Sequence, residues 1–245
     1  MAGSDIFLGE FIGTMILIVL GDGVVANVLL EKSKGQNSGW IVITAGWGFG
    51  VAIAVYVAGW ISGAHINPAV TLGFVAVGQV GAADAVIYLC GQFSGAFSGA
   101  VLVWLAYLPH WEKTESSELK LAVFCTGPAI RAYSRNLVAE IIGTAFLLIG
   151  VMGIFHANNG IGSGFGPYAV GILVFSLGLS LGGPTGYAIN PARDLGPRLA
   201  HALLPIAGKG HSDWAYAWVP IVGPVIGGVL GAVLYQTVVT RLVVG

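Results

Sequence analysis

Four long stretches of this 245-residue chain contain no Asp, Glu, Lys or Arg, and they constrain its fold more than any other feature. They cover residues 35–83, 85–111, 141–192 and 214–240. About 20 apolar residues are enough for a helix to cross a bilayer, so the first and third stretches can each hold two crossings. With an opening apolar stretch, the sequence predicts six spans, at 6–29, 40–59, 84–106, 136–156, 168–184 and 215–238.

The composition agrees with an all-α, multi-pass membrane protein. Charged residues make up 9% of the chain and hydrophobic residues 56%, whereas soluble domains carry about 25% charged residues. The 39 glycines suit spanning helices that pack closely. The net charge is −1 and the basic residues are scattered, so no nucleic-acid partner is expected.

Two apolar segments between the spans are too short to cross a membrane. Residues 62–79 read SGAHINPAVTLGFVAVGQ, and residues 185–204 read TGYAINPARDLGPRLAHALL. Each contains one Asn-Pro-Ala triplet: Asn67, Pro68 and Ala69 in the first, and Asn190, Pro191 and Ala192 in the second. Asn favours the N-cap of a helix and Pro favours its first turn, so each triplet predicts a re-entrant half-helix that starts inside the membrane.

An internal repeat relates the two halves of the chain. Residues 9–21, GEFIGTMILIVLG, resemble residues 139–151, AEIIGTAFLLIGV, and this match places Glu10 opposite Glu140. Each half holds three spans, so the second half must enter the membrane from the opposite side. We therefore expect a single membrane domain over 1–245, built from inverted three-helix repeats at about 1–108 and 136–245 that are joined by loop 107–135.

The two half-helices are expected to meet near the middle of the membrane. Two positive helix N-termini that face one point repel cations, so protons and sodium should be excluded there. Each Asn can cap its own helix and keep an NH2 donor free for a passing hydroxyl oxygen. The extended backbone before the triplets can offer carbonyl acceptors from Gly63, Ala64, His65, Gly186, Tyr187 and Ala188.

These motifs resemble the major intrinsic proteins, or aquaporins, and among them the glycerol facilitators, or aquaglyceroporins. The resemblance is carried by the GEF and AEI starts of the first and fourth spans, by SGAHINPAV and TGYAINPARD, and by VGP in the last span. It covers nearly the whole chain. It implies an aquaporin-like bundle of six transmembrane helices and two half-helices, with a pore in each subunit, that assembles as a homotetramer.

The resemblance also implies a plasma-membrane location with both termini in the cytoplasm. The distribution of basic residues favours the opposite orientation, because only Arg241 lies on the side of the termini. The other side holds Lys32, Lys34, Lys113, Lys120, Arg131, Arg135 and Lys209. We follow the family here, because the charge bias is a statistical rule.

The family's selectivity filter maps to Trp47, Gly178, Tyr187 and Arg193. Strict water channels of the family carry His at the position of Gly178, so this set is similar to that of glycerol facilitators, and Asp194 also matches them. The resemblance implies that Trp47 and Tyr187 face the carbon backbone of a polyol. The guanidinium of Arg193 would donate hydrogen bonds to the hydroxyls on the other side.

The resemblance thus implies a passive channel for glycerol and other small neutral solutes, with water, that excludes ions and protons. Dihydroxyacetone, urea, lactic acid and peroxide are further candidate solutes. A mainly water-selective aquaporin is the first alternative, because Tyr187 stands where many glycerol facilitators carry Phe. An ion-coupled secondary transporter is the second. No enzymatic activity, metal or cofactor is expected, because the sequence offers no metal cluster, phosphate loop or nucleophile paired with a base.

The carboxylates inside the predicted spans are candidates for coupling or for structural support. Glu10 and Glu140 occupy matching positions, which favours hydrogen bonding to the re-entrant backbone, and Asp194 is expected to give similar support. Asp22 is expected near the outer interface, with a pore role as the alternative. His65 could respond to pH, but a neutral, hydrogen-bonded ring is favoured.

Overall fold

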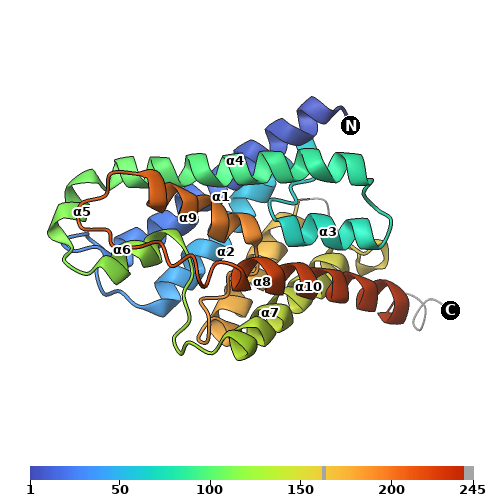
Figure 1. Cartoon of the computed structure of the whole chain (residues 1–245). Helices are drawn as coiled ribbons and strands as arrows, with labels where there is room; N and C mark the ends of the chain where they lie inside the picture. The colour runs from blue at the N-terminus through green and yellow to red at the C-terminus, as the bar shows by residue number, and fades with distance from the viewer. Residues whose placement is uncertain (162–163, 240–245) are drawn as a thin grey trace.

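The computed structural model describes residues 1–161 and 164–239, and these residues form helices joined by loops, with no strand among them. The long helices lie side by side in one bundle (Figure 1). They are α1 (Gly3–Leu29), α2 (Trp40–Ser62), α4 (Ala82–Ala106), α7 (Tyr133–Ile154), α8 (Gly166–Leu181) and α10 (Val219–Leu234), which a π-helical turn (Tyr235–Val239) extends. The short helices are α3 (Pro68–Ala76), α5 (Leu108–Lys113), α6 (Ser117–Phe124), α9 (Pro191–Leu203) and a 3-10 turn (Ala157–Asn159).

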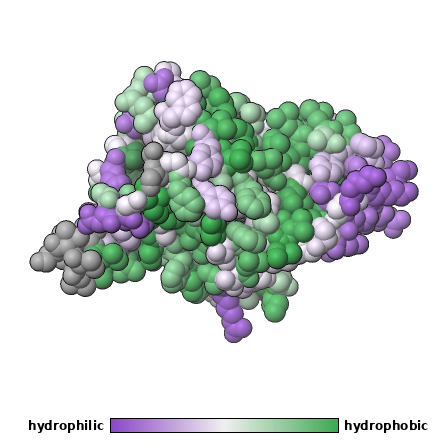
Figure 2. All heavy atoms as spheres, turned by 180° about the vertical axis from the view of Figure 1, so that it is seen from behind, coloured by the Kyte–Doolittle hydropathy of each residue, from purple (hydrophilic) through white to green (hydrophobic). Residues whose placement is uncertain are grey.

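The outer surface of the bundle is that of a membrane protein. Five of the described helices are long and apolar enough to cross a bilayer, and α8 is apolar over 16 residues. Apolar side chains cover the middle of the molecule, while hydrophilic residues gather toward its ends (Figure 2). Large hydrophobic side chains such as Trp60, which is 83% exposed, would be costly in water but suit lipid. The expected all-α membrane fold is confirmed.

Two predicted spans differ from the helices at their ends. The helix expected at 168–184 already ends at Leu181, because Pro184 disfavours a helical conformation in the residue before it. The helix expected at 215–238 begins only at Val219, after a run of turns, and carries a proline in its first turn. Both differences lengthen the non-helical segments that precede and follow α9 in the chain.

The half-helices begin where the triplets predict. The side chain of Asn67 accepts a hydrogen bond from the Ala69 amide at 2.9 Å, and that of Asn190 accepts from the Ala192 and Arg193 amides at 3.0 and 3.2 Å. Both caps are buried. The order α1–α2–α3–α4 recurs as α7–α8–α9–α10, so the chain places two helix N-termini inside the bundle.

Glycines allow α4 to lie directly on α1 and α10 directly on α7. A Cβ atom added to Gly95 would lie 2.3 Å from the Phe11 carbonyl oxygen, and one added to Gly227 would lie 2.3 Å from the Ile141 carbonyl oxygen. Such distances are far below van der Waals contact, and backbone atoms cannot move aside as a side chain can. The two helix pairs therefore depend on the absence of a side chain at these positions.

Gly95→Ala is expected to destabilise the protein by about 1–3 kcal/mol, the usual cost of overpacking. The measurement is the thermal unfolding midpoint of the detergent-solubilised protein. Gly23→Ala is the matched control, because Gly23 also lies inside a long helix but has no atom near its added Cβ. Alanine favours helix, so the control should hold or raise the midpoint. Equal midpoints for the two variants would contradict the packing argument.

Candidate functional site

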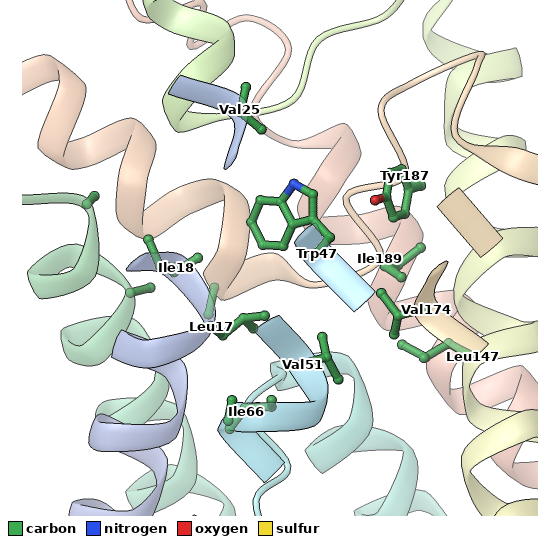
Figure 3. Packing of buried hydrophobic residues seen from close by; sticks show 14 of the residues in the cluster. Leu17, Ile18, Val25, Trp47, Val51, Ile66, Leu147, Val174, Tyr187 and Ile189 are labelled. Carbon is green, nitrogen blue, oxygen red and sulfur yellow. The ribbon is translucent and has the colours of Figure 1, made fainter. Parts of the chain in front are cut away.

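A cavity of about 310 Å³ lies between the two halves of the bundle. Helices α1, α2, α3, α7 and α8 supply an apolar wall, part of which is visible in Figure 3. The wall includes Leu17, Val51, Val55, Val70, Leu147 and Val174. The two re-entrant segments, residues 63–67 and 186–190, contribute the polar part of the lining. One line of polar backbone thus faces a largely apolar surface.

The two Asn side chains join the half-helices to each other. The Asn67 amide donates a hydrogen bond to the Ile189 carbonyl at 2.8 Å, and the Asn190 amide donates to the Ile66 carbonyl at 2.8 Å. The expectation that each NH2 group stays free is therefore wrong for one of its two N–H bonds. A buried carbonyl needs a donor, and the opposite Asn provides it. The second N–H of each amide has no acceptor among the described residues, and both residues line the cavity.

Glu10 fixes the first re-entrant segment from α1. Its carboxylate is fully buried and accepts hydrogen bonds from the His65 and Ile66 amides at 2.9 and 2.6 Å. The Ser62 hydroxyl and the Gln92 amide also donate to it, each at 2.7 Å. Such a saturated acceptor is the arrangement that a structural role requires.

Glu140 makes the corresponding contacts from α7. It accepts hydrogen bonds from the Ala188 and Ile189 amides at 3.0 and 2.9 Å and from the Thr185 hydroxyl at 2.6 Å. Tyr187 and Ile189 have positive φ angles of 39° and 44°. L-residues avoid this region, so the carboxylate holds the backbone in a conformation that it would otherwise leave.

The carboxylates of Glu10 and Glu140 also set the direction of the backbone carbonyls in the re-entrant segments. In a trans peptide the C=O is directed opposite to the N–H of the next residue. Amides that donate to Glu10 therefore turn the carbonyls of Ala64 and His65 away from it, and those that donate to Glu140 do the same for Tyr187 and Ala188. All four residues line the cavity, as do Gly63 and Gly186.

Of the four residues expected to form the filter, three line the cavity: Trp47, Tyr187 and Arg193. They lie at the end of the cavity beside α6. Trp47 and Tyr187 project toward the same space (Figure 3). The guanidinium of Arg193 lies over the Trp47 ring, with its central carbon 4.1 Å from the ring centroid. It therefore stacks on Trp47, where the resemblance implied that it would stand on the opposite side. A cation over an indole face is a favourable pair.

Gly178 is the exception, because it lies behind Tyr187 and is not part of the cavity lining. A Cβ atom added to it would lie 2.6 Å from the Tyr187 ring and 2.8 Å from Thr44. The Tyr187 ring thus occupies the space that the glycine leaves. The Tyr187 hydroxyl is buried and has no hydrogen-bond partner among the described residues.

Trp40 supports this arrangement and was missed by the sequence reasoning. Its indole N–H donates to the Gly178 carbonyl at 3.0 Å, and its ring meets the Tyr187 ring edge-on at 5.9 Å between centroids. The spacing could have indicated it, because Trp40 and Trp47 are seven residues apart and so share one face of α2.

Asp22 packs inside the bundle, and its expected depth near the outer interface stays a prediction. It is fully buried, and its Oδ1 lies 3.5 Å from Nη1 of Arg193. Helix α1 packs closely on α2 here, because a Cβ atom on Gly21 would collide with the Trp47 ring. That close approach brings the next residue of α1 beside Arg193.

A second buried ion pair anchors α9. Asp194 accepts hydrogen bonds from the Arg198 Nε at 2.8 Å and from the Thr126 amide and hydroxyl at 2.8 and 2.7 Å. Arg198 also donates to the Thr126 and Ser212 carbonyls, at 3.0 and 2.8 Å. All three donor nitrogens of this guanidinium are therefore used, and α9 is tied to the loops on either side of it.

The connecting segment 107–135 contacts Arg193 directly. The Phe124 carbonyl, at the end of α6, accepts a hydrogen bond from Arg193 at 3.3 Å. At the surface, the segment is held to the loop between α9 and α10. There Arg131 forms a bidentate ion pair with Asp213, with hydrogen bonds of 3.1 and 2.5 Å. These hydrogen bonds raise the pKa of the Arg131 guanidinium.

His65 lies in the packed, hydrogen-bonded setting that the sequence favoured. Its ring stacks on Tyr88 at 4.2 Å, and its Nδ1 lies 3.0 Å from the Thr71 hydroxyl. No group of three or more His, Cys, Asp or Glu side chains that could hold a metal ion occurs within 1–161 and 164–239.

Comparisons with known proteins agree with this geometry. The probable glycerol uptake facilitator of Thermotoga maritima is 64% identical over 232 residues, which cover 95% of this chain and 98% of that protein. Glycerol uptake facilitator protein 3 of Lactiplantibacillus plantarum is 54% identical, with 88% and 89% covered. The X-ray structure of the aquaglyceroporin from Plasmodium falciparum superposes with a TM-score of 0.89 at 29% identity and covers 98% of both chains. Residues 4–235 match the family described as Major intrinsic protein, and the chain belongs to that family.

Proposed function

We propose that this protein is a passive channel through which glycerol, other small neutral solutes and water diffuse across a membrane. The observation that carries the proposal is the two-sided cavity, with an apolar wall facing a line of carbonyl acceptors and Asn donors. Glycerol is similarly two-sided, because its hydroxyls can follow the polar line while its CH groups contact the wall. The relatives named as glycerol uptake facilitators support this choice of solute.

We assign the filter to Trp47, Tyr187 and Arg193, with Gly178 acting through the position of the Tyr187 ring. The guanidinium and the indole lie together, so a polyol would find donors and an apolar face side by side. The two half-helix N-termini at the middle of the cavity disfavour cations. The protein is a channel and not an enzyme, and two of the carboxylates that a coupled transporter would need, Glu10 and Glu140, accept hydrogen bonds from the re-entrant backbone.

A water-selective channel is the second candidate, and one observation favours it. The Tyr187 ring fills the space beside Gly178, so the filter is narrower than the glycine alone would make it. A narrower opening admits water before polyols.

Stopped-flow light scattering on proteoliposomes separates these candidates. We expect rapid shrinkage in sucrose, and rapid shrinkage followed by rapid re-swelling in glycerol, because only the second osmolyte passes the filter. Empty liposomes and a sorbitol gradient are the controls, and neither should give fast re-swelling. Rapid shrinkage without glycerol re-swelling would assign the protein to the water-selective class.

The proposal extends to the oligomeric state of the protein, to the membrane in which it lies and to its orientation there. We infer a homotetramer in the plasma membrane with cytoplasmic termini, as the family implies, and inverted repeats at about 1–108 and 136–245. Both ends of the described chain lie at the same end of the bundle (Figure 1), which supports an even number of crossings. Arg241, the basic residue on that side, lies outside the described residues, as do 162–163.

A further inference from the structure

The buried carboxylate of Asp22 has no hydrogen bond. Neither of its oxygens meets a donor among the described residues, and its side chain is fully buried. An isolated carboxylate in such a place would be very costly. Among the described residues, the charged group within ion-pair distance of Asp22 is that of Arg193, with 3.5 Å between Oδ1 and Nη1. This distance is too long for a good hydrogen bond, so the contact is mainly a charge interaction.

The other buried charges near α9 are already matched. Arg198 and Asp194 satisfy each other with two hydrogen bonds, at 2.8 and 3.1 Å. Among the described residues, the Arg193 guanidinium makes one hydrogen bond, to the neutral Phe124 carbonyl, and lies over the neutral Trp47 ring. The charge of its guanidinium is therefore balanced by Asp22 alone among its described contacts.

The position of Arg193 follows from these three contacts. The central carbon of the guanidinium lies over the Trp47 ring, and its Nη1 contacts both the Phe124 carbonyl and the Asp22 carboxylate on α1. Gly21 makes this possible, because any side chain there would displace the indole. Asp22 does not line the cavity, so it can act on a solute only through Arg193.

We propose that Asp22 is a positioning and specificity-determining residue of the filter. Its negative charge cancels that of Arg193 and holds the guanidinium against Trp47, so that the constriction admits neutral solutes and gives small oxyanions no binding site. This inference rests on the proposed function of the cavity as the path of the solute.

The physical reason is the low dielectric constant of the site. A guanidinium without a counter-charge presents parallel N–H bonds that suit a planar oxyanion, and the attraction is strong where water is excluded. With a carboxylate only 3.5 Å behind it, an approaching anion meets attraction and repulsion of similar size. Removal of the Asp22 charge should therefore turn the filter into an anion site that obstructs neutral solutes.

The test measures glycerol uptake and osmotic water flux in proteoliposomes while potassium nitrate replaces potassium gluconate at constant ionic strength. Nitrate is a small planar oxyanion, and gluconate is too bulky for the filter. We expect no effect of nitrate on the wild type and an inhibition of at least about threefold for Asp22→Asn, a size typical of coupled neighbours. Asp22→Ser removes the same charge with a smaller side chain and should respond similarly if Asp22→Asn folds poorly.

Two matched variants show whether the effect passes through Arg193. Asp5→Asn makes the same chemical change on an exposed residue of α1 and should stay insensitive to nitrate. The double variant Asp22→Asn with Arg193→Gln should lose the nitrate sensitivity, because the unbalanced cation is gone. A general loss of folding would lower both fluxes equally in nitrate and in gluconate.

Nitrate inhibition of Asp22→Asn that disappears in the double variant supports the proposal. Equal behaviour of Asp22→Asn and the wild type in nitrate overturns it, as does inhibition that persists without Arg193. If the wild type conducts water but no glycerol, the glycerol assignment fails, while nitrate inhibition of the water flux still decides the role of Asp22.

Discussion

Glu140→Ala is expected to prevent the protein from folding into a stable channel. The substitution leaves the Ala188 and Ile189 amides and the Thr185 hydroxyl without their acceptor, in a buried part of the bundle. Each buried donor left unpaired costs about 1–3 kcal/mol, so the total is about 3 kcal/mol or more. The left-handed backbone conformation at Tyr187 then also loses its support.

Thermal unfolding and size-exclusion chromatography in detergent measure this loss. Glu115→Ala is the matched control, because Glu115 is exposed in the loop between α5 and α6. Glu140→Gln should fall between the wild type and Glu140→Ala, since an amide oxygen can still accept some of the hydrogen bonds. A monodisperse Glu140→Ala protein with the midpoint of the wild type would show that the carboxylate does not hold the re-entrant segment.

Local rules explain why part of this site could be predicted from the sequence. An Asn followed by Pro specifies a helix start through contacts within three residues, so both half-helices begin where the triplets stand. The internal repeat placed Glu10 and Glu140 at equivalent points, and their contacts with the re-entrant backbone are equivalent in turn. Such features depend on short spacings or on internal symmetry.

The remaining features depend on contacts between distant segments, to which no local rule applies. The contact between Asp22 and Arg193 could not be predicted, because nothing near Asp22 in the sequence indicates that Gly21 brings α1 against Trp47. The stacking of Arg193 on that indole requires α2 and α9 to be placed first. The reciprocal Asn bonds were missed for the same reason, since each joins one half of the chain to the other.

Gly178→His is expected to reduce glycerol uptake by at least about tenfold while water flux falls less, because pore width limits the larger solute first. The Cβ atom alone would lie 2.6 Å from the Tyr187 ring and 2.8 Å from Thr44. The imidazole therefore fits only if the Tyr187 ring moves into the cavity, toward Trp47 and Arg193. The measurement is glycerol re-swelling of proteoliposomes, normalised to the amount of reconstituted protein.

Two further variants identify the Tyr187 ring as the cause. Gly183→His is the matched control, because Gly183 is exposed and its added Cβ meets no atom, so glycerol uptake should not change. Gly178→His combined with Tyr187→Ala should regain glycerol uptake, since the ring that the imidazole displaces is no longer there. If Gly178→His conducts glycerol like the wild type, the Tyr187 ring does not bound the path, and the filter must lie elsewhere in the cavity. If the single variant is closed and the double variant stays closed, the imidazole itself obstructs the path, and Gly178 shapes the filter directly instead of through Tyr187.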